Sequence, residues 1–332
     1  IGPFADARLD LLGSWYGQGQ ADKVVSILTG LKERFGADKV IYTKGSEPDK
    51  DDRSGFAAAL NAARSADKVV MAVGHPGFWS GEATSLTSIR IPAIQQELIQ
   101  EVAQSGKPLI LVLLNGRPLD LSWESTVADA IVEAWYPGTE GGHAVADVLS
   151  GDFNPCGKLT MTFPRNLGQV PIHYDAKNTG RPYTPGQGEQ HYVSRYLNEP
   201  TATPLYPFGY GLSYTTFEYS DLKVAPEKTD MKQPVAVTVT VKNTGKVRGT
   251  EVVQLYVRDL VASVTRPTRQ LKGFERVTLE PGESREVSFT ITSDAVGFYR
   301  QDMSFGYEPG DFKVWAGGSS DAALEGSFEI TK

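Results

Sequence analysis

The stretch KVVMAVGHPGFWSGEATSLTSIRIP, residues 68–92, decides how the first half of the chain is interpreted. Val69–Val73 is a short apolar run typical of a buried strand, and Pro92 suits the first turn of a helix predicted over Ala93–Gln104. The residues between them show no period, and they far exceed the roughly 2–6 residues that usually join a strand to a helix. In an open parallel sheet, such a loop leaves the carboxyl end of a strand, where these folds bind ligands. We therefore predict that Glu82, the carboxylate of this loop, takes part in chemistry.

Strand and helix patterns alternate along residues 1–165. The run Leu109–Leu114, LILVLL, is continuously apolar, as in strands that are covered on both faces. This pattern predicts an α/β domain, an αβα sandwich with a mostly parallel sheet between helices. The predicted helices span Asp22–Phe35, Phe56–Ala66, Ala93–Gln104 and Gly142–Leu149, and the predicted strands span Lys39–Tyr42, Lys68–Val73, Pro108–Leu114, Ala130–Trp135 and Lys158–Phe163.

The period of the apolar residues changes to two in the last third of the chain. Residues 166–217 come first and are rich in Pro, Gly and Tyr without a period, which predicts an irregular connector packed on the first domain. From residue 218, short alternating runs separated by turn residues predict an antiparallel β-sandwich over 218–332, and the missing Cys…Trp…Cys pattern favours the fibronectin type III-like version. The predicted strands span Val235–Val241, Thr250–Arg258, Gln270–Leu279, Ser284–Thr292 and Gly310–Ala316.

Composition and charge argue against several kinds of partner and site. The 332 residues carry a formal net charge of −7 and no basic run, so we expect no nucleic-acid partner. No apolar run approaches the roughly 18–20 residues that span a bilayer, so no membrane partner is expected. The single cysteine, Cys156, excludes an intramolecular disulfide, and the four histidines lack metal-ligand spacing, so no metal site is expected. Nucleotide-binding and serine-hydrolase motifs do not occur, and no cofactor is predicted.

Three side chains of the long loop are candidates for a site, and each has a structural alternative. Glu82 follows Phe78 and Trp79, surroundings able to raise the pKa of a carboxyl as a general acid requires; the alternative is a solvated loop residue. Trp79 is a candidate for stacking on a sugar ring, or else a loop anchor. His75 is a candidate contact for a substrate hydroxyl, with a structural hydrogen bond as the favoured alternative. Arg117, after the next predicted strand, is expected to brace loops through carboxylate pairs rather than to bind ligand.

Several longer motifs carry a family resemblance over essentially the whole chain. The chain resembles the C-terminal half of glycoside hydrolase family 3 enzymes, most closely the bacterial periplasmic β-glucosidases. The motifs are SGEATS-x-TSIRIP (Ser80–Pro92), LVLLNGRPLDLSW (Leu111–Trp123), AWYPGTEGGHAVADVLSGDFNPCGKLTMTFPR (Ala134–Arg165), NTGRPY (Asn178–Tyr183), PLYPFGYGLSYTTF (Pro204–Phe217) and RPTRQLKGFERVTLEPGE (Arg266–Glu283).

The resemblance implies a retaining, exo-acting β-glucosidase that is located in the periplasm or secreted and acts on β-glucosides or oligosaccharides. Such enzymes join a (β/α)₈ barrel, which carries the nucleophilic Asp, to an αβα sandwich and a fibronectin-like domain. By motif, the general acid/base is Glu82 on the loop 74–92. The barrel is missing from this chain, which begins at Ile1 without an initiator Met, so we expect a longer polypeptide and an inactive isolated chain.

One departure and two rival functions stay open. Similar sequences have Ser-Arg-Thr-Asp after the Glu, whereas this chain has Ser85-Leu86-Thr87-Ser88, so two charges that could fix the loop are neutral. A non-catalytic carbohydrate-binding or scaffolding module is the first rival. A self-contained α/β hydrolase or transferase is the second, and it would need a second active carboxylate or a nucleophile on the same edge. The sequence leaves the oligomeric state open, a homodimer included.

Overall fold

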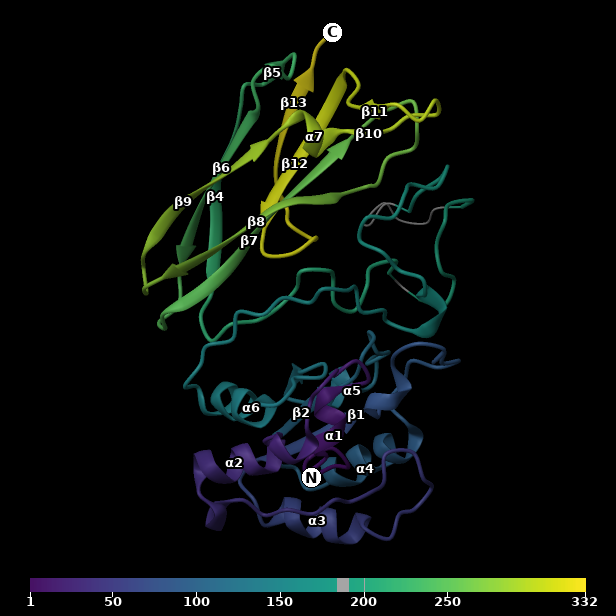
Figure 1. Ribbon diagram of the computed structural model, residues 1–332, viewed down its shortest axis with the longest axis vertical. Helices are drawn as coiled ribbons and strands as arrows, with labels where there is room; N and C mark the ends of the chain where they lie inside the picture. The colour runs from purple at the N-terminus through teal and green to yellow at the C-terminus, as the bar shows by residue number, and fades with distance from the viewer. Residues whose placement is uncertain (184–190, 200) are drawn as a thin grey trace. The chain divides into compact units, whose positions relative to one another are not determined.

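The computed structural model describes residues 1–183, 191–199 and 201–332, and it divides into two compact units (Figure 1). The first unit comprises Ile1–Phe153 and Pro164–Val170, and the second comprises Asn154–Phe163 and Pro171–Lys332. Each unit buries its own apolar cluster. In the described part of the chain, no helix has the length and apolar character that crossing a membrane requires.

The first unit is built on a parallel three-stranded sheet in the order β1-β2-β3. Ala72, Val112 and Leu114 point to one face of the sheet, where they pack with residues of helices α2 and α6. Neighbouring residues of the same strands point to the opposite face and are fully buried as well, so both faces are covered. The strands are β1 (Val69–Gly74), β2 (Leu109–Leu114) and β3 (Ala130–Glu133), and the helices are α1 (Arg8–Leu12), α2 (Ile27–Phe35), α3 (Phe56–Arg64), α4 (Ala93–Ala103), α5 (Glu124–Val127) and α6 (Gly141–Ser150).

The strand predicted over Lys39–Tyr42 is wrong. Residues 37–39 form a 3-10 turn, and Ile41 is 54% exposed, so this run buries too little apolar surface to hold a sheet position. The N-terminal residues lie along β1 instead: Ile1 donates to the carbonyl of Val70 at 2.9 Å, and the amide of Ala72 donates to the carbonyl of Ile1 at 2.9 Å.

One predicted helix begins later than expected, and a second predicted strand does not form. Helix α2 begins at Ile27 rather than at residue 22, because the hydroxyl of Ser26 caps it by accepting from the amide of Thr29 at 3.1 Å. The strand predicted over Lys158–Phe163 is wrong: the segment is irregular, and among the described residues its one β-bridge joins Phe163 to Tyr206 within the second unit.

The second unit contains the predicted β-sandwich, which is mostly antiparallel; the two-residue strand Lys228–Thr229 pairs parallel with β13. Val235, Val237, Val239 and Val241 alternate along β6 with zero exposure and form the centre of its core. The two sheets have the strand orders β5-β13-β12-β7-β8 and β4-β6-β9. The elements are β4 (Phe217–Ala225), β5 (Lys228–Thr229), β6 (Val235–Asn243), β7 (Gly249–Asp259), β8 (Gln270–Leu279), β9 (Ser284–Ile291), α7 (Ser293–Val296), β10 (Phe298–Tyr299), β11 (Phe305–Gly306), β12 (Gly310–Gly317) and β13 (Leu324–Ile330).

Connector residues after position 171 belong to the second unit, and some of them contact the β-sandwich; packing of the connector on the first domain stays a prediction. Tyr174 stacks on Phe208 with 4.2 Å between ring centroids and meets the edge of Tyr256 in β7 at 5.9 Å. The amide of Thr268 donates to the carbonyl of Ala176 at 2.9 Å. Tyr174 thus joins the connector to the sandwich through Tyr256; residues 184–190 and 200 lie outside the described residues.

Candidate active-site loop

The long loop leaves the carboxyl end of β1 through Gly74. This glycine has φ +134°, and a Cβ built on it would lie 2.1 Å from the carbonyl oxygen of Leu114 on the neighbouring strand, so only glycine fits. The side chain of Gln95 in α4 accepts from the amide of Gly74 at 2.8 Å and donates to its carbonyl at 2.9 Å. The start of the loop is therefore tied to both the sheet and the following helix.

Glu82 is exposed on a turn whose backbone is held on both sides. Arg117 donates through Nη1 to the carbonyl of Trp79 at 3.0 Å and through Nη2 to the carbonyl of Thr84 at 3.2 Å. The hydroxyl of Thr84 in turn donates to the carbonyl of Gly81 at 2.7 Å. The bracing role of Arg117 is confirmed, although its acceptors are main-chain carbonyls and not carboxylates.

Helix α1 and the residues just after it hold the loop from a third side. Asp10 accepts from the amide of Gly77 at 2.8 Å, and the hydroxyl of Ser14 contacts the carbonyls of Gly77 and Ser80. A Cβ on Gly81 would lie 3.1 Å from Nε1 of Trp15, so this tryptophan lies next to the turn. These contacts were not predicted, because they join residues more than 60 positions apart in the sequence and no local sequence pattern indicates them.

His75 and Trp79 lie close together at the base of the loop. Their ring centroids are 5.2 Å apart, and His75 is 1% exposed, with Nε2 at 2.8 Å from the carbonyl of Arg90. Burial lowers the pKa of His75, which keeps the imidazole neutral and able to donate to this carbonyl. The structural hydrogen bond expected as the alternative is present, and a substrate contact by His75 or Trp79 stays a prediction.

Exposed aromatic side chains border the turn of Glu82. Phe78 is 70% exposed and Trp15 is 75% exposed, whereas Trp79 is partly buried. Large exposed apolar side chains gathered at one place are characteristic of surfaces that contact another molecule or domain. Of these residues, only Trp79 was a candidate from the sequence. Trp15 was missed because it lies far from the loop along the chain.

A partly buried carboxyl at the end of β3, Glu133, is the other group that the sequence did not single out. Burial raises the pKa of Glu133 to about 8, although it accepts from the amide of Trp135 at 2.9 Å and from the side-chain amide of Asn115 at 3.2 Å. Asn115 is fully buried and also donates to the carbonyl of Arg117 at 2.9 Å. Glu133 is thus linked through Asn115 to the main chain of the bracing arginine.

We expect Glu133 to make the stability of the first unit fall as the pH rises. Its pKa is about 8 in the folded chain and about 4.5 in the unfolded chain, so the folded state binds more protons between pH 5 and 8. The free energy of unfolding should drop by about 1–3 kcal/mol over this range, and Glu133→Gln should flatten the slope. Urea unfolding at several pH values measures this, with Asp67→Asn, an exposed carboxyl-to-amide change, as control. An unchanged slope in Glu133→Gln would contradict the assignment.

Comparison with known proteins agrees with this two-part architecture. The family model described as glycosyl hydrolase family 3 C-terminal domain matches residues 1–214, and the fibronectin type III-like domain matches residues 251–320. The α/β domain followed by a fibronectin type III-like sandwich is therefore confirmed.

Curated relatives and solved structures match nearly the whole chain. The periplasmic β-glucosidase of Salmonella typhimurium is 46% identical over 99% of this chain and 46% of its own length. A β-xylosidase of Formosa agariphila is 43% identical over 94% of this chain and 42% of its own length. The crystal structure of a β-glucosidase from Listeria innocua in complex with isofagomine superimposes with a TM-score of 0.92 at 40% identity, over 99% of this chain and 45% of that one.

The chain spans less than half the length of these relatives. The matching segment holds the α/β unit with its braced loop as well as the β-sandwich. The chain therefore belongs to glycosyl hydrolase family 3, of whose members it represents the C-terminal part.

Proposed function

We propose that this chain is the C-terminal part of a retaining, exo-acting β-glucosidase and supplies its general acid/base, Glu82. The observation that carries the proposal is a carboxylate that is exposed while the main chain around it is fixed by Arg117. A proton donor must be held in place and yet open to its substrate, and this loop meets both conditions. Membership in glycosyl hydrolase family 3 supports the reaction class.

In this proposal the reaction uses two carboxyl groups, and only one belongs to the chain. A nucleophilic Asp on a preceding (β/α)₈ barrel attacks the anomeric carbon of a terminal β-D-glucosyl residue while Glu82 protonates the departing oxygen. Glu82 then takes a proton from the water that hydrolyses the glycosyl-enzyme. Retention requires the two carboxyls to lie about 5–5.5 Å apart. The exposed Phe78 and Trp15 beside the turn suit contact with such a barrel.

The neutral residues Leu86 and Ser88 do not argue against a fixed loop. They stand where similar sequences have charged residues, but the turn of Glu82 is held by Arg117 on either side of it. Ser88 accepts from the amide of Arg90 at 3.3 Å, a local contact that a serine hydroxyl supplies without a charge. The orientation of Glu82 in this proposal thus depends on hydrogen bonds that the main chain of the turn makes within the first unit.

Relatives named β-glucosidase and β-xylosidase support a glycoside substrate, and the glucosyl preference is part of the proposal. The relative with a periplasmic name supports a periplasmic or secreted location. In the proposed longer polypeptide, p-nitrophenyl β-D-glucoside should be hydrolysed and NMR should detect β-glucose as the first product, while the 332-residue chain alone should release no p-nitrophenol.

Two outcomes would contradict this proposal. The first is release of p-nitrophenol by the isolated chain at a rate that Glu82→Gln abolishes, because the chain would then hold a complete site. The second is α-glucose as the first product of the longer polypeptide, because that stereochemistry belongs to an inverting reaction. A non-catalytic carbohydrate-binding module would instead show glycan binding that survives deletion of residues 74–92.

A further inference from the structure

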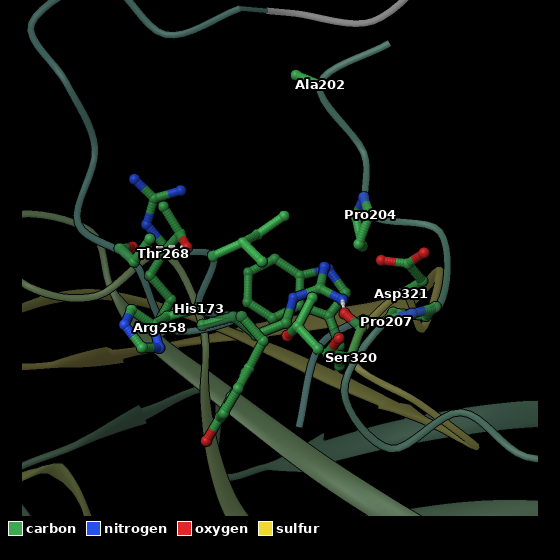
Figure 2. Close-up of a pocket in the computed structure, with 14 residues that line it drawn as sticks. His173, Ala202, Pro204, Pro207, Arg258, Thr268, Ser320 and Asp321 are labelled. Atoms are coloured by element: carbon green, nitrogen blue, oxygen red, sulfur yellow. Dashed lines mark hydrogen bonds between the residues drawn. The ribbon is translucent and has the colours of Figure 1, made fainter. Parts of the chain in front are cut away.

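A cavity of about 570 Å³ lies within the second unit, far along the chain from the loop of Glu82 (Figure 2). Its walls come from connector residues 172–176 and 202–207 and from residues at or near the ends of β7, β8 and β12. This volume falls in the range of about 300–1,000 Å³ that small-molecule sites occupy.

Two arginines line the cavity, and the first, Arg269, makes no ion pair at hydrogen-bonding distance with any residue that the structure describes. The guanidinium of Arg269 lies 4.1 Å from the ring centroid of Trp315, and its Nη1 donates to main-chain carbonyls, to that of Ala322 at 3.1 Å and to that of Ser320. Burial lowers the pKa of Arg269, an effect that the nearby Asp321 opposes. The charge of Arg269 is therefore only partly compensated.

The second arginine has still fewer partners. The Nε of Arg258 is buried and has no hydrogen-bond acceptor among the described residues, and no ion pair of this side chain occurs there. A buried donor without an acceptor costs free energy of folding. The lining contains two arginines and one carboxylate, Asp321, and Glu325 also acts on the charge of Arg269 without lining the cavity; the formal net charge of the whole chain is −7. The cavity is thus locally positive and lacks an acceptor that a bound anion would provide.

We propose that this cavity binds a compact oxyanion, a carboxylate or a phosphate, carried on a polyhydroxylated small molecule such as an acidic sugar. The planar guanidinium of Arg258 matches the two oxygens of such a group in a bidentate pair. Asp321 repels a second anionic group and accepts from hydroxyls, so it selects a ligand whose other side carries hydroxyl groups. Thr268 and Ser320 add polar atoms to the wall; Figure 2 labels them together with Arg258 and Asp321.

Isothermal titration of the 332-residue chain with four probes tests the proposal. D-Glucuronate or D-glucose 6-phosphate should bind, the stronger of the two showing which oxyanion is preferred, and binding should weaken as salt rises from 0.05 to 0.5 M. Neutral D-glucose should bind at least tenfold more weakly. If D-glucose binds as tightly as the acidic probes, the role of the anion is overturned. If inorganic phosphate binds as tightly as D-glucose 6-phosphate, the role of the hydroxyls is overturned. If no probe binds, the whole proposal is overturned.

Arg258→Met separates a binding role from a structural one. Because the guanidinium has no partner in the described structure, the variant should unfold at the same or a higher temperature without ligand, yet lose at least tenfold in affinity for the acidic probe. Arg285→Met is the matched control, since this exposed arginine pairs with Glu283 and does not line the cavity. A lowered unfolding temperature with unchanged affinity in Arg258→Met would overturn the proposal. The result does not depend on Glu82 or on glucosidase activity.

Discussion

Glu82→Gln in the proposed longer polypeptide is expected to lower kcat/KM for cellobiose by about 10²–10⁴-fold. Glutamine keeps the size of the side chain but has no proton to give, so a sugar leaving group must depart as an unprotonated alkoxide. The main chain around residue 82 is held by Arg117 and Thr84 through carbonyl contacts that the substitution does not touch. The loss should therefore be chemical and not the result of a displaced loop.

The choice of substrate makes this prediction specific. Dinitrophenyl β-D-glucoside has a leaving group that needs no proton, so its first step should be nearly unaffected and a burst of dinitrophenolate should precede slow hydrolysis of the glycosyl-enzyme. Azide, which needs no general base, should then accelerate turnover and yield β-glucosyl azide. Glu140→Gln changes an exposed carboxyl of the same unit that pairs with His143; it serves as control and should leave all rates unchanged. An equal loss of kcat/KM for both substrates would argue against Glu82 as the acid/base.

Gly30→Ala is expected to destabilise the first unit by about 3 kcal/mol, although alanine normally stabilises a helix by about 1 kcal/mol relative to glycine. Gly30 lies in α2 where this helix crosses α6, and a Cβ there would be 2.2 Å from the carbonyl oxygen of Gly142. A Cβ on Gly142 would likewise be 2.1 Å from the carbonyl oxygen of Ser26. Both obstacles are backbone atoms, so the helices must separate to admit even one methyl group.

Thermal and urea unfolding of Gly30→Ala measure this effect, and Gly157→Ala provides the comparison. A Cβ at position 157 would meet no atom within 4 Å, and that residue has no left-handed φ, so its replacement should change the unfolding free energy little. Stability of Gly30→Ala equal to or above that of the original chain would show that helix propensity outweighs the close crossing, contrary to the geometry.

Much of the fold follows from local patterns. The continuous apolar runs of residues 69–73 and 109–114 predict buried parallel strands, and the alternation in Val235–Val241 predicts a strand of a sandwich with one buried face. Lys39–Tyr42 misled the prediction because its apolar residues remain exposed in the structure. A local apolar run shows that a segment is able to form a buried strand. Which segment lies along the edge of β1 depends on tertiary packing, and the N-terminal residues occupy that edge.

The sequence by itself determined the two architectures, the position of the loop and the carboxylate that the loop presents, because periodicity, turn residues and motifs are local properties of the chain. Only the tertiary structure decided what surrounds that carboxylate and what lines the cavity of the second unit. Arg117 and Ser14 reach the loop from distant positions, desolvation raises the pKa of Glu133 to about 8, and Nε of Arg258 lacks an acceptor among the described residues. These properties arise from packing between segments far apart in the chain, where desolvation and contact distance, and not residue type alone, set the energy.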